Sequence, residues 1–431
     1  MNRGRKDLWA ACAFLAPNFL GFVVFLAFPV VFSLVVAFTN WDLSLHNRYR
    51  HEPVQWTGLR NFIEILTHRD FWKYTANTLY LMLGIPIGIA GSLFLAVQLT
   101  KPLRSTGRQG RYVLALAGLC SFVALGWFLF SNGAGITWLI VALMSGIVIA
   151  VGFVSGPVVY RTLLYLPHFT SGVAVFLLWK HIYNPIKGPM NVALEPVLDG
   201  LAQAVQHSPQ FLWHGLGIFA WVAAVVGVMS LGAAALRSAW AGDSGLGATL
   251  LSLVVLVLGA LVLWGAGGVL WDLPVLAADG LTPPKWLNDV HWAKPALIIM
   301  GLWAAVGSNN MLLYIAGISN IPQELYEAAD IDGAGRWQRF WFITWPQLAP
   351  TTFFIVIISF IGGLQGGFEQ ARTMTRGGPF GATTTLSYFV YTEGFETGRL
   401  GYGSAIAWLM FVVIFTLTVV NYRIGSSYAH E

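Results

Sequence analysis

Charged residues are scarce in this 431-residue chain, since lysine, arginine, aspartate and glutamate together make up only 10% of it. A soluble globular protein carries about 25%, so the chain lacks the polar side chains needed to cover a water-facing surface. Apolar residues make up 56%, and the mean hydropathy is +0.66. These proportions exclude a soluble globular protein and indicate an integral membrane protein.

Cysteine and the sequence signatures of common catalytic sites are also rare or missing. Cys12 and Cys120 each lie within an apolar run, which argues against a disulfide framework or a cysteine-ligated metal cluster. The dipeptide Gly-Lys does not occur, so the phosphate-binding GxxxxGK[ST] loop is absent, and so are HExxH and GxSxG. We therefore predict a non-catalytic chain with no catalytic residue, no metal site and no bound cofactor.

Ten apolar runs are long enough to cross a bilayer, which takes about 20 residues. They are residues 8–38, 75–98, 112–131, 136–156, 162–183, 211–236, 246–271, 293–317, 351–369 and 404–422. We predict an all-α polytopic membrane protein with about ten transmembrane helices. The first run far exceeds the apolar core of a cleaved signal peptide, which has about 7–15 residues, so we expect it to remain as a span.

Basic residues at the ends of these runs predict the orientation. Three precede the first run within residues 3–6, and four lie between the second and third runs within residues 101–111. Cytoplasmic loops are enriched in lysine and arginine. We expect a multi-pass protein of the inner, cytoplasmic membrane with both termini in the cytoplasm. The long segments 39–74 and 370–403, on the other side, read as surface caps.

One polar segment, residues 320–346, differs from every other loop. Pro322 suits the first turn of a helix, and Glu327 lies close to the positive end of its dipole. Ala328 adds to a narrow face of small side chains, and Gly333 ends the helix. A second short helix, 336–343, ends before Pro346. The pattern predicts a helix–turn–helix at the membrane surface, which suits either a docking surface or an interfacial linker.

The same segment resembles the EAA loop of permease subunits in binding-protein-dependent ABC importers, specifically the maltose-type, carbohydrate-uptake branch. That pattern has Glu-Ala-Ala, a later glycine, and an isoleucine and a proline at fixed spacing, with a leucine where this chain has Trp345. The positions that match this pattern are Glu327, Ala328, Ala329, Gly333, Ile343 and Pro346. We assign Asp330, which directly follows Ala329, to the same ATPase-coupling set. The resemblance implies that Glu327 makes a polar contact with an ATP-hydrolysing subunit, against which Ala328 and Ala329 pack.

Further stretches resemble the same branch and imply a six-span permease core. Residues 1–98 would hold its first two spans, 158–204 one more span, and 281–431 the C-terminal part with the coupling loop 318–349. Residues 99–157 and 205–280 would then be two inserted transmembrane hairpins that add four spans. Each hairpin suits either a lipid-facing collar or a site for an extra subunit.

The resemblance implies a permease subunit of an ATP-driven ABC importer for a sugar or oligosaccharide. Its partners would be a second homologous permease, two cytoplasmic ATP-binding subunits that use the ATP, an extracytoplasmic solute-binding protein and the lipid bilayer, but no nucleic acid. An ion-gradient-driven secondary transporter is the alternative. It requires buried carboxylates or broken helices in paired halves, and the sequence shows neither. A transferase acting on lipid-linked sugar lacks its catalytic acids.

Polar residues within two late runs are candidates for the substrate path. Asn309, Asn310 and Tyr314 place hydrogen-bonding groups in the run 293–317. In the run 351–369, Gln365 lies among glycines and precedes Phe368 and Glu369. An amide suits a polyhydroxyl ligand, but small residues and buried amides are equally common where helices pack. Both interpretations stay open.

Overall fold

The computed structural model describes residues 3–50, 52–100, 108–133, 136–155, 157–170, 172–240 and 246–426. Within these ranges the regular secondary structure is helical, and the connecting loops contain one isolated bridge, between Thr39 and Trp56. Seven helical segments are long and apolar enough to cross a membrane: Ala11–Ala37, Arg69–Thr100, Tyr112–Ser131, Gln210–Ala234, Ala293–Ser319, Ala349–Thr375 and Leu400–Val419. The prediction of an all-helical, multi-pass chain is confirmed.

The predicted number of ten spans is not confirmed. The remaining three runs correspond to shorter apolar helices among the described residues, namely Ile136–Val151, Gly172–Ile182 and Val262–Ala278. Two of these belong to longer helices, α7 (Ile136–Ser155) and α12 (Leu246–Ala278), whereas the run 162–183 is divided between α8 (Pro157–Phe169) and α9 (Gly172–Ile182). Lys101 and Arg104, on which the predicted orientation partly rests, lie outside the described residues.

The chain divides into two compact units. Unit 1 comprises Met1–Ala115, Ala150–Lys180 and Trp286–Glu431, and unit 2 comprises Leu116–Ile149 and His181–Lys285. Unit 2 takes in most of the two stretches expected as inserted hairpins, and it also includes α10 (Pro189–Gln206), which we assigned to the core. The division into a six-span core and two insertions stays a prediction.

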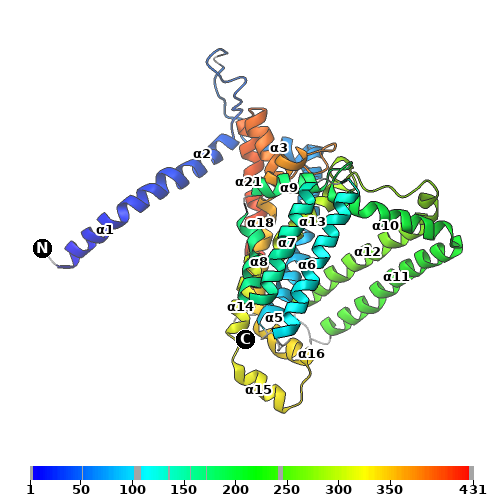
Figure 1. Cartoon of the computed structure of the whole chain (residues 1–431). Coiled ribbons are helices and arrows are strands. Elements are labelled where there is room, and N and C mark those ends of the chain that lie inside the picture. The colour runs from blue at the N-terminus through cyan, green and yellow to red at the C-terminus, as the bar shows by residue number, and fades with distance from the viewer. Residues whose placement is uncertain are drawn as a thin grey trace. The chain divides into compact units, whose positions relative to one another are not determined.

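The N-terminal part of unit 1 is a long apolar helix. It consists of α1 (Arg3–Phe22), the π-helical turn η1 (Val23–Ala27) and α2 (Phe28–Ala37), and Figure 1 draws it as one continuous rod. Only 6% of its most apolar window is buried, and the buried residues Val36 and Ala37 lie where α2 packs on α21 (Leu400–Ser426). Most of its apolar surface is therefore open to lipid or to another chain.

The core of unit 1 forms around α5 (Gly84–Thr100), which follows α3 (Arg60–Thr67) and α4 (Arg69–Leu81). α5 packs on α13 (Ala293–Val306), α14 (Asn309–Ser319) and α18 (Ala349–Gln365), and α8 (Pro157–Phe169) and α9 (Gly172–Ile182) belong to the same unit. The buried residues at the centre are Leu93, Ala96, Met311, Tyr314, Leu348 and Ile355. This cluster joins the first and last thirds of the chain.

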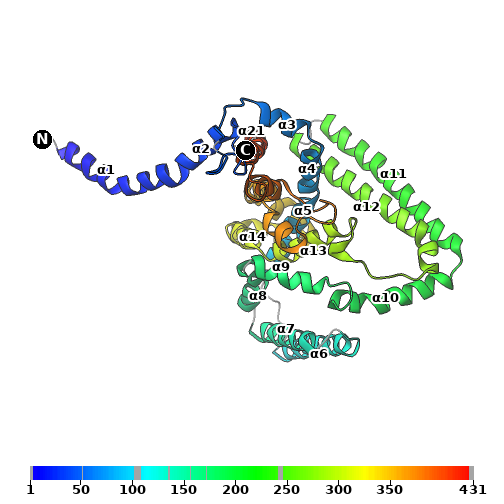
Figure 2. The same ribbon diagram turned by 90° about the horizontal axis from the view of Figure 1, so that it is seen from above.

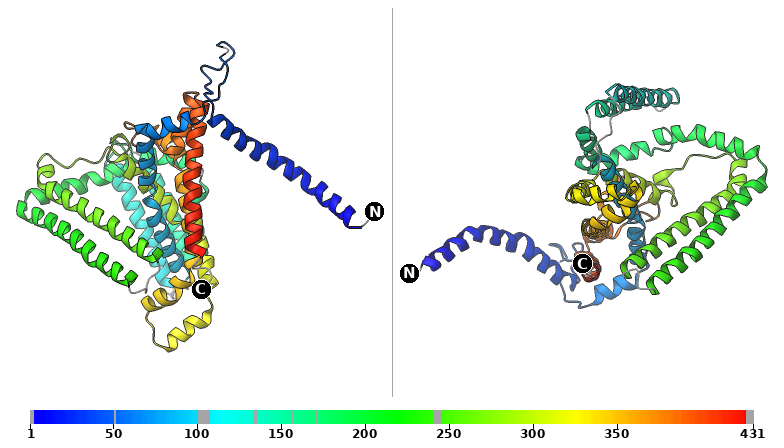
Figure 3. Two further views of the ribbon diagram at one scale, coloured as in Figure 1. Left: turned by 180° about the vertical axis from the view of Figure 1, so that it is seen from behind. Right: turned by 90° about the horizontal axis from the view of Figure 1, so that it is seen from below.

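Unit 2 contains two helix pairs and α10. The helix α6 (Arg108–Ser131) enters it and pairs with α7 (Ile136–Ser155). The long helices α11 (Gln210–Trp240) and α12 (Leu246–Ala278) lie side by side in Figures 2 and 3. A Cβ on Gly217 would lie 2.9 Å from the Gly267 carbonyl oxygen, so these two backbones approach closely, as small residues permit between membrane helices.

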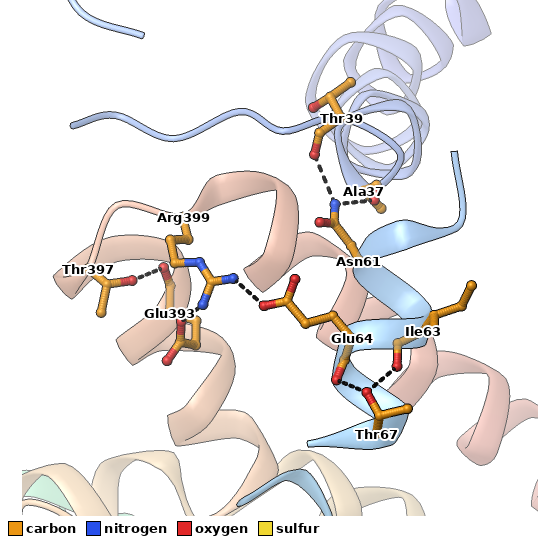
Figure 4. Close-up of polar contacts among 9 residues, drawn as sticks. All are labelled: Ala37, Thr39, Asn61, Ile63, Glu64, Thr67, Glu393, Thr397 and Arg399. Carbon is orange, nitrogen blue, oxygen red and sulfur yellow. Dashed lines mark hydrogen bonds and ion pairs between the residues drawn. The ribbon is translucent and has the colours of Figure 1, made fainter. Parts of the chain in front are cut away.

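The segments 39–74 and 377–403 together form one cap on unit 1. This cap lies at the end of the unit away from the C-terminal end of α14 and the start of α18. Asn61 Nδ2 donates to the carbonyl oxygens of Ala37 (2.9 Å) and Thr39 (2.8 Å), which ties α3 to the end of α2. Arg399 Nη2 donates to Glu64 Oε1 at 2.7 Å and Nη1 to Glu393 Oε2 at 3.3 Å (Figure 4). The two segments expected as separate surface caps are thus a single one.

Arg399 is the centre of this cap. Its guanidinium lies 4.0 Å from the ring centroid of Tyr402 and forks between carboxylates that come from α3 and from the π-helical turn η5 (Thr392–Glu396). Burial raises the pKa of Glu393 above its ordinary value, and the guanidinium partly opposes that shift. A side chain that binds two acids through a planar fork cannot be replaced by lysine without losing one contact.

We expect Arg399→Ala to lower the free energy of unfolding by about 1–2 kcal/mol, because Glu393 is left half-buried without its partner. Loss of the cation raises the pKa of Glu393 in the folded state further. A carboxyl group with a raised folded-state pKa destabilises the folded protein increasingly as the pH rises above the pKa of the unfolded chain. The deficit measured by thermal unfolding in detergent should therefore be larger at pH 7 than at pH 5. Arg60→Ala, an exposed change on α3, is the control, and an equal loss in both variants contradicts the assignment.

Candidate functional site

The polar segment 320–347 folds into two short helical pieces that leave the membrane-spanning helices. α15 (Gln323–Ile331) follows α14, and α16 (Arg336–Arg339) leads through a π-helical turn, η3 (Phe340–Thr344), into α17 (Trp345–Gln347) and α18. Figure 1 shows α15 and α16 projecting below the ends of α14 and α5. We call residues 320–347 the coupling segment, after the role that the sequence resemblance implies.

The second helix of the coupling segment does not end before Pro346, and that expectation was wrong. The π-helical turn widens the helix so that Trp345 N–H donates to Phe340 O, and Pro346 then occupies the first turn of α17. A proline is accommodated in a first turn because its missing N–H has no intrahelical partner there. A single helical path therefore runs from α16 to Leu348, where α18 begins.

Gly333 forms the turn between the two pieces. Its φ is +71°, a left-handed conformation that side chains with a Cβ disfavour. Gly333 N–H donates to Asp330 O at 3.2 Å and Ala334 N–H to Ala329 O at 2.9 Å. These two bonds form a Schellman motif, which satisfies the last carbonyls of α15. The glycine of the predicted pattern thus has a definite backbone role.

Two side-chain contacts link α15 to the residues that follow the Gly333 turn. Asp330 forms an ion pair with Arg339 across the turn, and Tyr326 Oη lies 2.9 Å from Thr344 Oγ1. Ala329 is buried beside these contacts and is 9% exposed. Asp330 and Ala329, both predicted to belong to the ATPase-coupling set, therefore make their contacts within the chain.

The opposite side of α15 is open. Glu324, Glu327, Ala328 and Ile331 recur at three- and four-residue spacing and are all exposed; we call them the α15 face. Ile331 is 87% exposed, and Glu327 Oε1 accepts a bond from Gln323 Nε2 at 2.9 Å. Of the remaining predicted positions, Ile343 is half-buried and Pro346 exposed. The segment thus presents a rigid, mixed polar and apolar surface to the outside.

The candidates for the substrate path fall into two groups. Gln365, Phe368 and Glu369 line a cavity of about 540 Å³ near the end of α18. Tyr314 is fully buried in the core around α5, and Asn310 Nδ2 lies 3.4 Å from Ser359 Oγ on α18. These contacts are those of helix packing. Asn309 is exposed at the first residue of α14.

Two membrane helices are broken close to these residues, a feature that the sequence did not indicate. α13 ends at Val306 and α14 begins at Asn309, where Ser308 Oγ accepts a bond from Asn310 N–H at 3.3 Å. α18 ends at Gln365, and Gly367, with a φ of +83°, leads into α19 (Phe368–Gln370) and the π-helical turn η4 (Ala371–Thr375). A Cβ on Gly367 would lie 2.7 Å from Thr385 Cγ2.

A larger cavity, of about 980 Å³, adjoins Phe368 and Glu369 and contains residues that sequence reasoning missed. Three cations line it, Lys180, Arg372 and Arg376, together with Glu396 and the ring of Tyr388. The Arg372 guanidinium lies 4.5 Å from the ring centroid of Tyr391, and Phe368 is 5.0 Å from the same ring. Lys180 comes from α9, almost two hundred positions earlier, so no local pattern could have found the set.

Comparison with known proteins identifies the family. Residues 142–428 match the family model described as binding-protein-dependent transport system inner membrane component. The chain belongs to this family. It is 24% identical over 431 residues, 99% of this chain and 93% of the relative, to the probable ABC transporter permease protein YesP of Bacillus subtilis. It is 33% identical over 157 residues, 36% of this chain and 50% of the relative, to the arabinooligosaccharides transport system permease protein AraP of the same organism.

Solved structures share the fold of this permease. One is a bacterial alginate ABC transporter in complex with alginate pentasaccharide-bound periplasmic protein, with a TM-score of 0.57 and 18% identity, over 97% of this chain and 95% of that one. A second, of a bacterial ABC transporter involved in the import of the acidic polysaccharide alginate, has a TM-score of 0.58, also at 18% identity, over 99% of both chains. The chain is thus an inner-membrane permease component of a binding-protein-dependent transport system, and the prediction of this family is confirmed.

We expect Gly333→Ala to open the turn of the coupling segment. The left-handed conformation costs an alanine about 1–2 kcal/mol, even though nothing lies within 4 Å of the added Cβ. Limited proteolysis of the purified protein should cleave between α15 and α16 faster than in the wild type. Gly335→Ala is the matched control. Gly335 has an ordinary φ of −67°, and an added Cβ would lie 3.5 Å from Gln338 Oε1, a normal contact distance. Equal cleavage of both variants rejects the turn's role.

Proposed function

We propose that this permease is the membrane subunit of an ATP-driven importer of oligosaccharides and that its coupling segment docks on a cytoplasmic ATP-binding subunit. Family membership supports the class of transporter. The α15 face supports the docking because it exposes Ile331, the small side chain of Ala328 and two glutamates. The helix that carries them is linked to the following helix by the Asp330–Arg339 ion pair. Burying one isoleucine contributes about 1.5–3 kcal/mol, and a preformed helix loses little entropy on binding.

The remaining partners follow from the same class. The exposed apolar helix α1–α2 and the cavities near Glu369 suit a second, homologous permease, with the translocation path between the two. The cap built around Arg399 suits an extracytoplasmic solute-binding protein, and a solved relative of the same fold was captured with its periplasmic protein. Two ATP-binding subunits would use the ATP, so that this chain itself binds no cofactor and catalyses no reaction, with both termini in the cytoplasm.

The larger cavity supports an oligosaccharide that carries acidic sugars. Lys180, Arg372 and Arg376 outnumber the acids Glu369 and Glu396 there, and guanidinium groups bind carboxylates through paired hydrogen bonds. Phe368 and Tyr388 add aromatic surface for the apolar faces of sugar rings. Gln365, in the adjoining cavity, offers an amide to hydroxyl groups. Both solved relatives named above handle alginate, an acidic polysaccharide.

One observation favours the alternative, an ion-gradient-driven secondary transporter. Two membrane helices are broken, and secondary transporters bind their ions at such breaks. The α15 face has no role in that mechanism. Uptake that vanadate blocks and that an ionophore leaves intact supports the ATP-driven importer. The reverse result supports the alternative.

We expect Ala328→Trp to reduce the amount of ATP-binding subunit that co-purifies with the tagged chain about tenfold, because an indole does not fit a closely packed interface. The chain should keep its thermal stability, since Ala328 is exposed. Gln347→Trp is the control, an exposed position at the other end of the coupling segment. Normal recovery of the ATP-binding subunit with Ala328→Trp contradicts the docking face.

We expect Arg372→Gln to lower uptake of an oligouronide by the reconstituted transporter about tenfold, the value of one charge-assisted hydrogen bond. Uptake of a neutral oligosaccharide of equal length should change little. Arg372→Lys keeps the charge and should retain part of the activity. If the variant loses both substrates alike, Arg372 has a structural role through Tyr391 rather than one in selecting acidic sugars.

A further inference from the structure

A separate groove of about 380 Å³ lies between α5 and the start of α16. Leu93, Phe94 and Val97 of α5 form one wall, and Trp337 and Phe340 contribute from the coupling segment. Within the described part of the chain, Arg336 is the one charged side chain that lines it. The groove shares no residue with the cavities near Glu369 or with the α15 face, so the proposed transport function does not account for it.

The groove spans the boundary between hydrocarbon and water. Its α5 wall belongs to the membrane-spanning segment Arg69–Thr100 and lies within the last turns before that segment ends. Phe94 is 62% exposed and Trp337 75% exposed, although both are large and apolar. Tryptophan gathers at membrane–water interfaces, where one side of the ring is wet. The open side of the groove therefore faces the layer of lipid headgroups.

The charge in the groove is free. Arg336 has neither an ion pair nor a side-chain hydrogen bond among the residues that the structure describes. Arg339, one helical turn later, is by contrast held by Asp330. An unpaired guanidinium beside an apolar wall at the membrane surface matches a ligand with an anionic head and an apolar tail. Basic pockets between membrane helices bind anionic lipid headgroups in this way.

We propose that this groove binds an anionic phospholipid, with its phosphate on Arg336 and an acyl chain along Leu93, Phe94 and Val97. A neutral lipid or an apolar protein segment would leave the cation unused. A lipid held here contacts α5 and α16 together. It thereby fixes the coupling segment against the membrane just after the Gly333 turn, independently of what docks on the α15 face.

The test uses the full-length chain, with the subunits that co-purify, in nanodiscs that mix phosphatidylglycerol with phosphatidylcholine. Phosphatidylglycerol retained after extraction is counted by native mass spectrometry. Arg336→Gln should lower retention about fivefold, the value of one basic residue at an anionic membrane surface. Arg336→Lys should retain most of it. Arg237→Gln, an exposed arginine in the last turn of α11, is the matched control and should change nothing.

A photoreactive benzoylphenylalanine at Phe94 identifies the occupant directly. Phosphatidylglycerol cross-linked in preference to phosphatidylcholine supports the proposal. Cross-links to another protein chain overturn it and mark the groove as a subunit interface. Equal labelling of both lipids, or equal retention in Arg336→Gln and the wild type, also overturns it. Both positions are exposed, so folding of the variants is checked by an unchanged elution volume and melting temperature.

Discussion

A lipid bilayer offers no hydrogen-bond partner to a peptide group, and the architecture of this permease follows from that constraint. Helices satisfy it locally, so helix breaks are tolerated only where neighbours supply partners. At the break after α13, Ser92 Oγ lies 3.0 Å from the Ala305 carbonyl oxygen and 3.2 Å from that of Val306. A Cβ on Gly307 would lie 1.8 Å from the Leu164 carbonyl oxygen, so α8 closes over the same point. The break is buried in protein rather than exposed to lipid.

The second break, at Gly366–Gly367, meets the same constraint and opens space. Ser387 Oγ donates to the Gly366 carbonyl oxygen at 2.7 Å, so α20 (Leu386–Tyr391) supplies the partner that the helix lacks. The chain then turns, and Phe368 and Glu369 lie where both cavities meet. Irregular backbone at membrane depth is expected where it lines a cavity. Gln365 is therefore placed in the cavity wall by the glycines around it.

Sequence reasoning reached the helical class, the family and the helix–turn–helix of residues 320–347 because these depend on local signals. Composition and apolar runs indicate spans, and the Gly333 turn depends on one residue type. What it missed depends on tertiary contacts. Arg399 and Glu64 are 335 positions apart, and Lys180 joins Arg372 only through the packing of α9. The helix breaks were missed because Ser308 and Gly366 lie within long apolar runs. The ion pair of Asp330 depends on the position of Arg339 across the turn.

For the proposed function, the contacts of the coupling segment define a route from the proposed docking surface to the cavity beside Gln365. The α15 face points outward, whereas Asp330 and Tyr326 attach α15 to the helical path from α16 to α17. That path ends at Leu348, which is fully buried among Leu93, Met311 and Ile355. α18 begins there and rises by about 25 Å over its 17 residues to Gln365. A helix cannot shorten without breaking its hydrogen bonds, so the coupling that we propose would carry a displacement of α15 along α18 to the cavity wall at its far end.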